Sequence, residues 1–272
     1  MMIGDGDERW FKELCMIDLY HVPLPVLFLV GLALIWGVSE LGWWYGQRGD
    51  GQSTNISTLE SATAGLLALI IGFTFAMALA RFEARRDAVV QEANAIGTTA
   101  LRARLLPEPY RAESLKLLRE YVKVRLEAFQ SGHSFADLQT AVERSNVVQE
   151  ALWKHAKAIA EKDPALIPAG LFIQSLNQMI DAQGVRLAVL RNRIPSIVLV
   201  MLYVLAAAAS GFVGYASAID PRLTRLPVAI MGLLISLVLY LIIDLDRPNN
   251  GFITNNQQAM IDVAEQIAGF KD

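Results

Sequence analysis

The sequence predicts an all-α, polytopic membrane protein with four transmembrane helices and a helical cytoplasmic domain between spans two and three. The chain has 272 residues, of which 54% are hydrophobic and only 19% are charged, whereas a typical soluble domain carries roughly 25% charged residues. Charged residues are missing from several long stretches of the sequence. Four stretches contain no Asp, Glu, Lys or Arg, namely Val22–Ser39, Ser61–Ala80, Ile194–Ile219 and Leu226–Ile243. A helix crosses a bilayer with about 17 to 25 residues, so each stretch is long enough to span it.

The first span follows a polar N-terminal segment. Residues 1–21 carry acidic and basic side chains, and they lack the basic start and apolar centre of a cleavable signal peptide. We therefore expect the first span to stay in the mature protein, and the apolar side chains among these charges favour an interfacial segment. After the span, Trp43–Tyr45 is typical of an aromatic belt at the outer interface. Glu40 is interpreted as reaching the headgroups beside it.

The second span and the chain after it are expected to form one long helix. Ser57–Glu60 has the pattern of a capping box, which predicts the start of the helix. Phe82–Leu106 contains one glycine and no proline, so the helix should continue from the membrane into the next domain.

Residues 83–193 are predicted to form a helical stalk domain, because they are rich in good helix formers. Pro107 and Pro109 should interrupt the helices once, since proline lacks a backbone donor and clashes with the preceding turn. The segment Ser131–Ser134 and the pair Asp163–Pro164 should interrupt them again.

Basic residues cluster at both ends of the stalk domain. They are Arg81, Arg85 and Arg86 at its start, and Arg186, Arg191 and Arg193 at its end. Positively charged loops stay inside, so the stalk and both termini are expected in the cytoplasm. Arg222 and Arg225, in the last short loop, argue against this orientation. The predicted divisions are 1–82, 83–193, 194–247 and a cytoplasmic tail, 248–272.

The last two spans carry small and polar residues with distinct roles. The run Ala206–Gly214 predicts tight helix packing in span three. Span four ends in a polar turn with Asp244, Asp246, Arg247 and Asn249. The favoured interpretation is a local ion pair that fixes the exit of the chain; the alternative is a calcium site, because carboxylate and amide oxygens are hard ligands. In the tail, an apolar stripe from Met260 to Phe270 is expected to dock on the stalk or on a neighbouring subunit.

Composition excludes several classes of function. The net charge of −3 provides no basic field for nucleic acid. One cysteine and three scattered histidines make no zinc motif, and the phosphate-binding, dinucleotide-binding and hydrolase motifs are missing from the sequence. We therefore expect no enzyme, no cofactor and no bound metal.

One face of the second span combines small and bulky side chains at helical spacing: Gly65, Leu69, Gly72, Phe73 and Ala76. Such a face permits close helix packing. It also suits a pore in which Leu69 and Phe73 form an apolar constriction that gates by dewetting. The residues alone leave both interpretations open.

Several segments resemble one known family. Arg81–Thr99 resembles the signature of the bacterial bestrophin-like membrane proteins, and Leu176–Asp181, Arg186, Ile194–Pro195 and Asp244–Pro248 resemble its later landmarks. The resemblance covers roughly residues 25 to 253. Bestrophins are pentameric anion channels whose second transmembrane helix lines a narrow apolar neck.

The resemblance implies a position for each part of such a channel. It maps the neck onto Leu69 and Phe73, and the cytoplasmic mouth onto Arg81 and Arg85. Gly65 stands where a third bulky ring would lie, so a three-ring neck is not implied. The acidic run of the animal calcium clasp is missing after span four, so calcium gating is not implied either.

The sequence thus favours a homo-oligomer, most simply a pentamer, that lies in a lipid bilayer and conducts small inorganic ions, anions first, along an axis lined by the second span. The alternative is a membrane-anchored scaffold or sensor whose spans only pack, because no span carries a charge near its middle. A secondary transporter fits less well, since the four spans show no inverted repeat.

Overall fold

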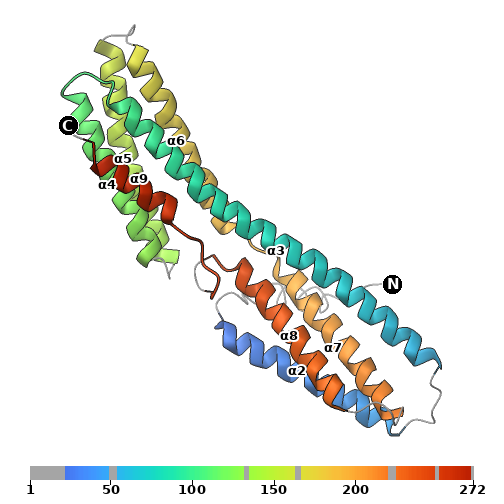
Figure 1. Ribbon diagram of the computed structural model, residues 1–272. Helices are drawn as coiled ribbons and strands as arrows, with labels where there is room; N and C mark the ends of the chain where they lie inside the picture. Colours follow the sequence, from blue (N-terminus) through green and yellow to red (C-terminus); the bar gives the residue numbers. More distant parts are fainter. Residues whose placement is uncertain are drawn as a thin grey trace, which may run out of the picture. The chain divides into compact units, whose positions relative to one another are not determined.

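The computed structural model describes residues 22–48, 54–131, 135–162, 167–219, 225–248 and 251–270, and every regular element in them is a helix (Figure 1). The all-α prediction is therefore confirmed. The helices are α2 (Leu24–Gly46), α3 (Thr54–Ala103), α4 (Tyr110–Ser131), α5 (Phe135–Lys162), α6 (Ile167–Arg191), α7 (Ser196–Ile219), α8 (Arg225–Asp246) and α9 (Gln258–Ala268). The predicted N-terminal interfacial segment lies outside the described residues. The chain divides into two compact units.

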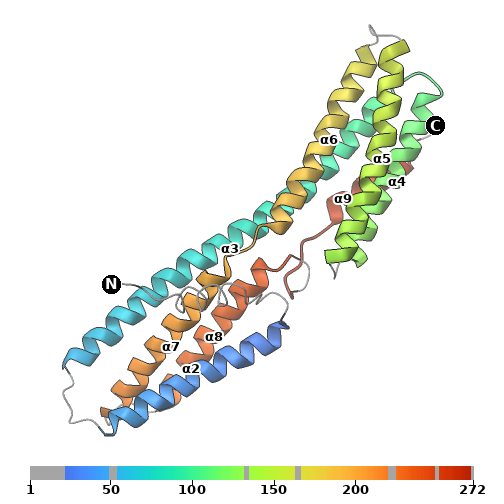
Figure 2. The ribbon, with the colours of Figure 1, turned by 180° about the vertical axis from the view of Figure 1, so that it is seen from behind.

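The membrane unit contains α2, α3 as far as Ala80, α7, α8, and the turn Gly251–Ile253. Four helices in the described residues are long and apolar enough to cross a bilayer, and each overlaps one of the four predicted spans. Within this unit α2, α7 and α8 pack side by side (Figure 1 and Figure 2).

Glycines bring the backbones of α2 and α7 into direct contact. A Cβ atom on Gly42 would overlap the carbonyl oxygen of Gly211, and a Cβ atom on Gly214 would overlap that of Ser39. The small-residue run of α7 is thus used for packing against α2, as predicted. Glycine is required at these positions because any side chain would push the two helices apart.

Helix α3 is continuous for 50 residues, which confirms the long helix predicted from the absence of proline. Its start differs from the prediction. The helix begins at Thr54, three residues before the expected N-cap at Ser57, so Ser57–Glu60 lies inside the helix and does not cap it. Ser and Glu are compatible with helix interiors, and the pattern alone does not fix a boundary.

The stalk unit contains α3 from Arg81, then α4, α5, α6 and α9. α3 ends at Ala103 and α4 begins at Tyr110, so the pair of prolines separates them as predicted. The breaks predicted at 132–134 and at Asp163–Pro164 lie outside the described residues, and the next described helices begin at Phe135 and Ile167.

Helix α9 belongs to the core of the stalk unit. Its apolar side chains Met260, Val263 and Ile267 are buried in the same cluster as residues of α3, α4, α5 and α6. Arg119, on α4, donates hydrogen bonds to the carbonyl oxygens of Ile267 and Phe270. The tail was predicted to dock on the stalk or on a neighbouring subunit, and in the structure α9 packs on the stalk.

Candidate functional site

The candidate pore face of α3 is exposed in the single chain. Gly65, Leu69, Gly72, Phe73 and Ala76 are all exposed, with Leu69 at 56% and Phe73 at 65%. No described atom lies within 4 Å of where a Cβ would stand on Gly65 or Gly72. These five residues, called the open face below, are largely left uncovered by the described chain.

The opposite face of α3 packs against its own chain. Leu67, Thr74 and Ala78 are buried. Residues of this face line an apolar cavity of about 150 Å³ together with residues of α7 and α8. Thr74 Oγ1 donates to the carbonyl oxygen of Ile70 at 2.8 Å, so its hydroxyl is satisfied within the helix. Helix α3 therefore packs against its own chain with one face and leaves the opposite face exposed.

The two arginines predicted at the mouth lie in different environments. Arg81 is half-buried, whereas Arg85 is only 1% exposed and lines a cavity inside the stalk unit. Arg85 follows Thr74 by eleven residues, which is close to three turns, so it continues the buried face of the helix.

The polar turn after α8 fixes the chain by hydrogen bonds to the backbone. Asp244 accepts from the backbone N–H groups of Phe252, at 2.8 Å, and Ile253, at 3.0 Å. Asp246 accepts from the N–H of Ile194 at 2.9 Å, immediately before α7. The exit of α8 is thereby tied to the start of α7, in agreement with a structural role.

Arg247 completes this turn. Its Nη2 donates to the carbonyl oxygen of Val22 at 2.5 Å, immediately before α2, so three ends of the membrane unit meet here. Asn249 lies outside the described residues. Among the residues that the structure describes, no group of three His, Cys, Asp or Glu is placed to hold a metal ion, and the carboxylates already accept backbone hydrogen bonds. The turn is better explained as structural than as a calcium site.

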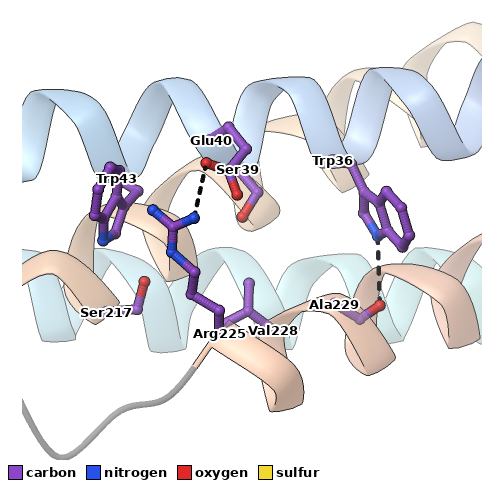
Figure 3. Close-up of a pocket in the computed structure, with 8 residues that line it drawn as sticks. All are labelled: Trp36, Ser39, Glu40, Trp43, Ser217, Arg225, Val228 and Ala229. Atoms are coloured by element: carbon purple, nitrogen blue, oxygen red, sulfur yellow. Dashed lines mark hydrogen bonds and ion pairs between the residues drawn. The ribbon is translucent and has the colours of Figure 1, made fainter.

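A pocket of about 210 Å³ opens between α2, α7 and α8 (Figure 3). Arg225 approaches Glu40, with 3.7 Å between Nη1 and Oε2, and its guanidinium carbon lies 3.8 Å from the ring centroid of Trp43. Trp36 donates from Nε1 to the carbonyl oxygen of Ala229. Glu40, expected to reach the headgroups, thus has a basic partner, and both charged side chains are exposed.

Comparison with known proteins identifies the family. The family model for the Bestrophin-like domain matches residues 27–260. The chain belongs to the Bestrophin-like family. It is a bestrophin-like membrane protein with several membrane-spanning helices, and no curated protein matches it.

Solved structures of a bacterial bestrophin homologue from Klebsiella pneumoniae share the fold. One single-substitution variant of that homologue has a TM-score of 0.66 at 16% identity, and the match covers 91% of this chain and 99% of that chain. Another variant has a TM-score of 0.64 at 14% identity, over 90% and 97%. A third structure has a TM-score of 0.62 at 16% identity, over 89% and 96%.

The bestrophin-like chain also contains a buried polar network in the stalk unit that sequence reasoning missed. At its centre is Glu92, which is fully buried. Glu92 Oε1 lies 2.7 Å from Arg125 Nε, and Oε2 lies 2.6 Å from Arg186 Nη1. The residues come from α3, α4 and α6 and are distant in the sequence, so no local spacing reveals them. Glu92 lies within the Arg81–Thr99 segment and Arg186 is one of the landmarks that resemble the family, but the resemblance alone does not show that they meet.

Tyr121 connects this charge cluster to two glutamines. Its hydroxyl donates to Gln183 Oε1 at 2.7 Å and lies 3.1 Å from Glu92 Oε1. Gln149 donates from Nε2 to Gln183 Oε1 at 2.5 Å. Burial raises the pKa of Tyr121 far above its usual range, with the Glu92 carboxylate adding to the effect, so the hydroxyl stays neutral and able to donate.

The opposite charges of Glu92 and of its two arginine partners stabilise one another. Burial by itself raises the pKa of Glu92, but the charges of Arg125 and Arg186 outweigh it and bring the pKa below its ordinary value of 4.5. Burial lowers the pKa of Arg186, and repulsion from Arg125 adds to this, while attraction to Glu92 opposes both. Two guanidinium groups thus share one carboxylate inside the stalk.

Proposed function

We propose that this chain forms a bestrophin-like ion channel, selective for anions, in which several copies of α3 surround an axial pore. The open face carries the proposal. It is apolar, it lies on a membrane-spanning helix, and its own chain leaves it uncovered. Membership of the Bestrophin-like family supports the same function. The simplest assembly is a homopentamer in a bacterial inner membrane, with both termini in the cytoplasm.

The composition of the open face fits a narrow pore. Gly65, Gly72 and Ala76 let neighbouring helices approach closely, whereas Leu69 and Phe73 project from the same face. Rings of such apolar side chains make a constriction that excludes water when it is narrow and conducts when it widens. Arg81, a little more than two turns beyond Phe73, places positive charge beyond one end of this constriction. Positive charge there raises the local concentration of anions.

Electrical recording tests conduction directly. Purified protein in planar bilayers should give single-channel currents whose reversal potential follows the chloride gradient. A reversal potential that follows the cation gradient would contradict anion selectivity. Intact oligomers that carry no current would contradict the channel itself.

The constriction is tested by shortening Phe73. Phe73→Ala removes the aromatic ring, so single-channel conductance or basal leak should rise severalfold if the ring narrows the pore. Leu29→Ala is the matched control, because Leu29 is equally exposed, at 61%, but lies on α2, and its currents should equal those of the wild type. An unchanged conductance in Phe73→Ala would remove Phe73 from the neck.

A scaffold or sensor without a pore is the second candidate. The observation that favours it is the same exposure of Leu69 and Phe73, because lipid-facing helices also present large apolar side chains. The structure of the assembled oligomer distinguishes the channel from the scaffold. An image of the purified oligomer with an opening bordered by α3 supports conduction, whereas an axis filled by packed helices supports the scaffold.

A further inference from the structure

A small cavity in the stalk unit is lined by three arginines. Arg85, Arg125 and Arg186 border it, together with Asn255 and Gln257 from the segment before α9, and the other described lining residues are apolar. All three arginines are nine-tenths or more buried. The described lining residues include no carboxylate.

The carboxylate that binds Arg125 and Arg186 lies outside the cavity wall. Glu92 approaches these two arginines at 2.7 and 2.6 Å, so both of its oxygens are engaged. One negative charge therefore faces two guanidinium groups. Positive charge without a matching anion is costly in a low-dielectric interior.

One donor on the cavity wall has no acceptor. Arg125 is 3% exposed, and its Nη1 has no hydrogen-bond partner among the described residues, although Nε and Nη2 both approach Glu92. Arg186 Nη2 is satisfied, since it donates to Gln257 Oε1 at 2.8 Å. A buried guanidinium donor normally finds an acceptor, and the cavity is the space beside it.

The size of the cavity limits what can fill it. Its volume is about 30 Å³, and a cavity can hold one water molecule when this volume reaches about 10–15 Å³. Nucleotides, carboxylic acids with side chains and phosphate esters exceed this volume. A halide ion fits, and guanidinium N–H groups with apolar walls suit a weakly hydrated anion.

We propose that this cavity binds one small inorganic anion of halide size, held by Arg125 Nη1 and by the positive charge of Arg186. The anion balances the excess charge around Glu92 and stabilises the junction of α3, α4 and α6 with the segment before α9. This site is separate from the open face of α3. The proposal does not depend on conduction, because a chain that carries no current can still bind an anion here.

Crystals of the full-length protein grown in bromide test the position of the anion. We expect an anomalous bromide peak in contact with Arg125 Nη1, displaced by chloride. A cavity without a bromide peak, or one that holds only water in the presence of bromide, would overturn the proposal. Bromide peaks elsewhere, for example along the open face, do not substitute for a peak in the cavity.

Thermal unfolding tests the same site in solution. At constant sodium and ionic strength, replacing gluconate, which is too large for the cavity, by chloride should raise the melting temperature in a saturable way by about 2–4 °C. The readout is this difference between the two salts, so a variant with a lower melting temperature remains informative. Equal melting temperatures in chloride and gluconate would contradict the proposal.

A cavity-filling substitution separates the site from general salt effects. Ala128 borders the cavity without charge, so Ala128→Met should occupy the space and abolish the chloride dependence while all three arginines remain. Ala158→Met, a half-buried position on α5 outside this cavity, is the matched control and should keep the wild-type difference. If the chloride dependence survives in Ala128→Met, the anion binds elsewhere and the assignment fails.

Discussion

At the scale of single residues, Glu92 is the position on which the stalk unit depends most. Its carboxylate is fully buried and contacts Arg125 and Arg186, while Tyr121 lies within hydrogen-bonding distance. Transferring a carboxylate from water to such a site is costly, and the arginines compensate for it. The same logic makes the arginines dependent on Glu92, because removing the carboxylate leaves both guanidinium groups buried beside each other.

Glu92→Gln should therefore destabilise the stalk by about 3–5 kcal/mol, since it breaks two buried ion pairs and leaves their partners uncompensated. The free energy of unfolding in detergent, from denaturant titration, measures the change. Glu161→Gln is the control, because Glu161 pairs with Lys157 on the surface, and such exposed pairs contribute about 0–1 kcal/mol. Equal stability in the two variants would show that the buried cluster contributes nothing.

The pH dependence of stability follows from the direction of the Glu92 pKa. Because the folded pKa is lower than the ordinary value of 4.5, this group stabilises the fold fully above about pH 4.5, and its contribution disappears as the pH falls toward the folded pKa. Glutamine does not titrate. Between about pH 7 and about pH 3, the melting temperature should therefore fall more steeply in the wild type than in Glu92→Gln. Parallel curves would contradict the assigned direction.

At the scale of elements, composition and proline placement predicted most of the fold. Charge-free blocks located the four spans because a bilayer requires about 20 apolar residues, and the absence of proline from Phe82 to Leu106 predicted that α3 continues beyond the membrane. The capping pattern at Ser57 failed, since the helix begins earlier. Arg85, assigned to the mouth by its position in the sequence, is buried in the stalk unit, and its role at the mouth stays a prediction.

The buried network could not be predicted in the same way. Glu92, Arg125 and Arg186 are separated by at least one complete helix or loop, so their meeting depends on how α3, α4 and α6 pack. Helical periodicity specifies which face of each helix turns inward. It does not specify which residue on another helix lies opposite.

Helix contacts in the membrane unit give a prediction at this scale. Gly42→Ala places a methyl group against the Gly211 carbonyl oxygen and the backbone of Tyr215, so α2 and α7 should separate, at a cost of about 1–3 kcal/mol. Gly37→Ala, on the same helix, meets nothing within 4 Å, and it should be neutral or slightly stabilising. Thermal unfolding of both variants in detergent checks the difference. A Gly42→Ala protein as stable as Gly37→Ala would contradict the close approach of the two backbones.

At the scale of the whole molecule, the open face requires a partner that one chain does not supply. Leu69 and Phe73 are more exposed than most apolar side chains of α3, and the opposite face of the helix is already packed against α7 and α8. Either lipid or further copies of the chain cover this surface. Only the second arrangement brings identical residues of different copies together around an axis.

Cysteine crosslinking distinguishes these two arrangements. In a Cys15→Ser background, which removes the only native cysteine, Leu69→Cys should form disulfides between copies under mild oxidation, because a narrow neck brings the same position of adjacent subunits within reach. One cysteine per chain permits only pairs, so the expected product is a covalent dimer on a denaturing gel that disappears on reduction. Leu29→Cys, at an equally exposed position of α2, should stay monomeric. If Leu69→Cys forms no dimer while the protein remains oligomeric, α3 does not line the axis, and its apolar face is covered by lipid.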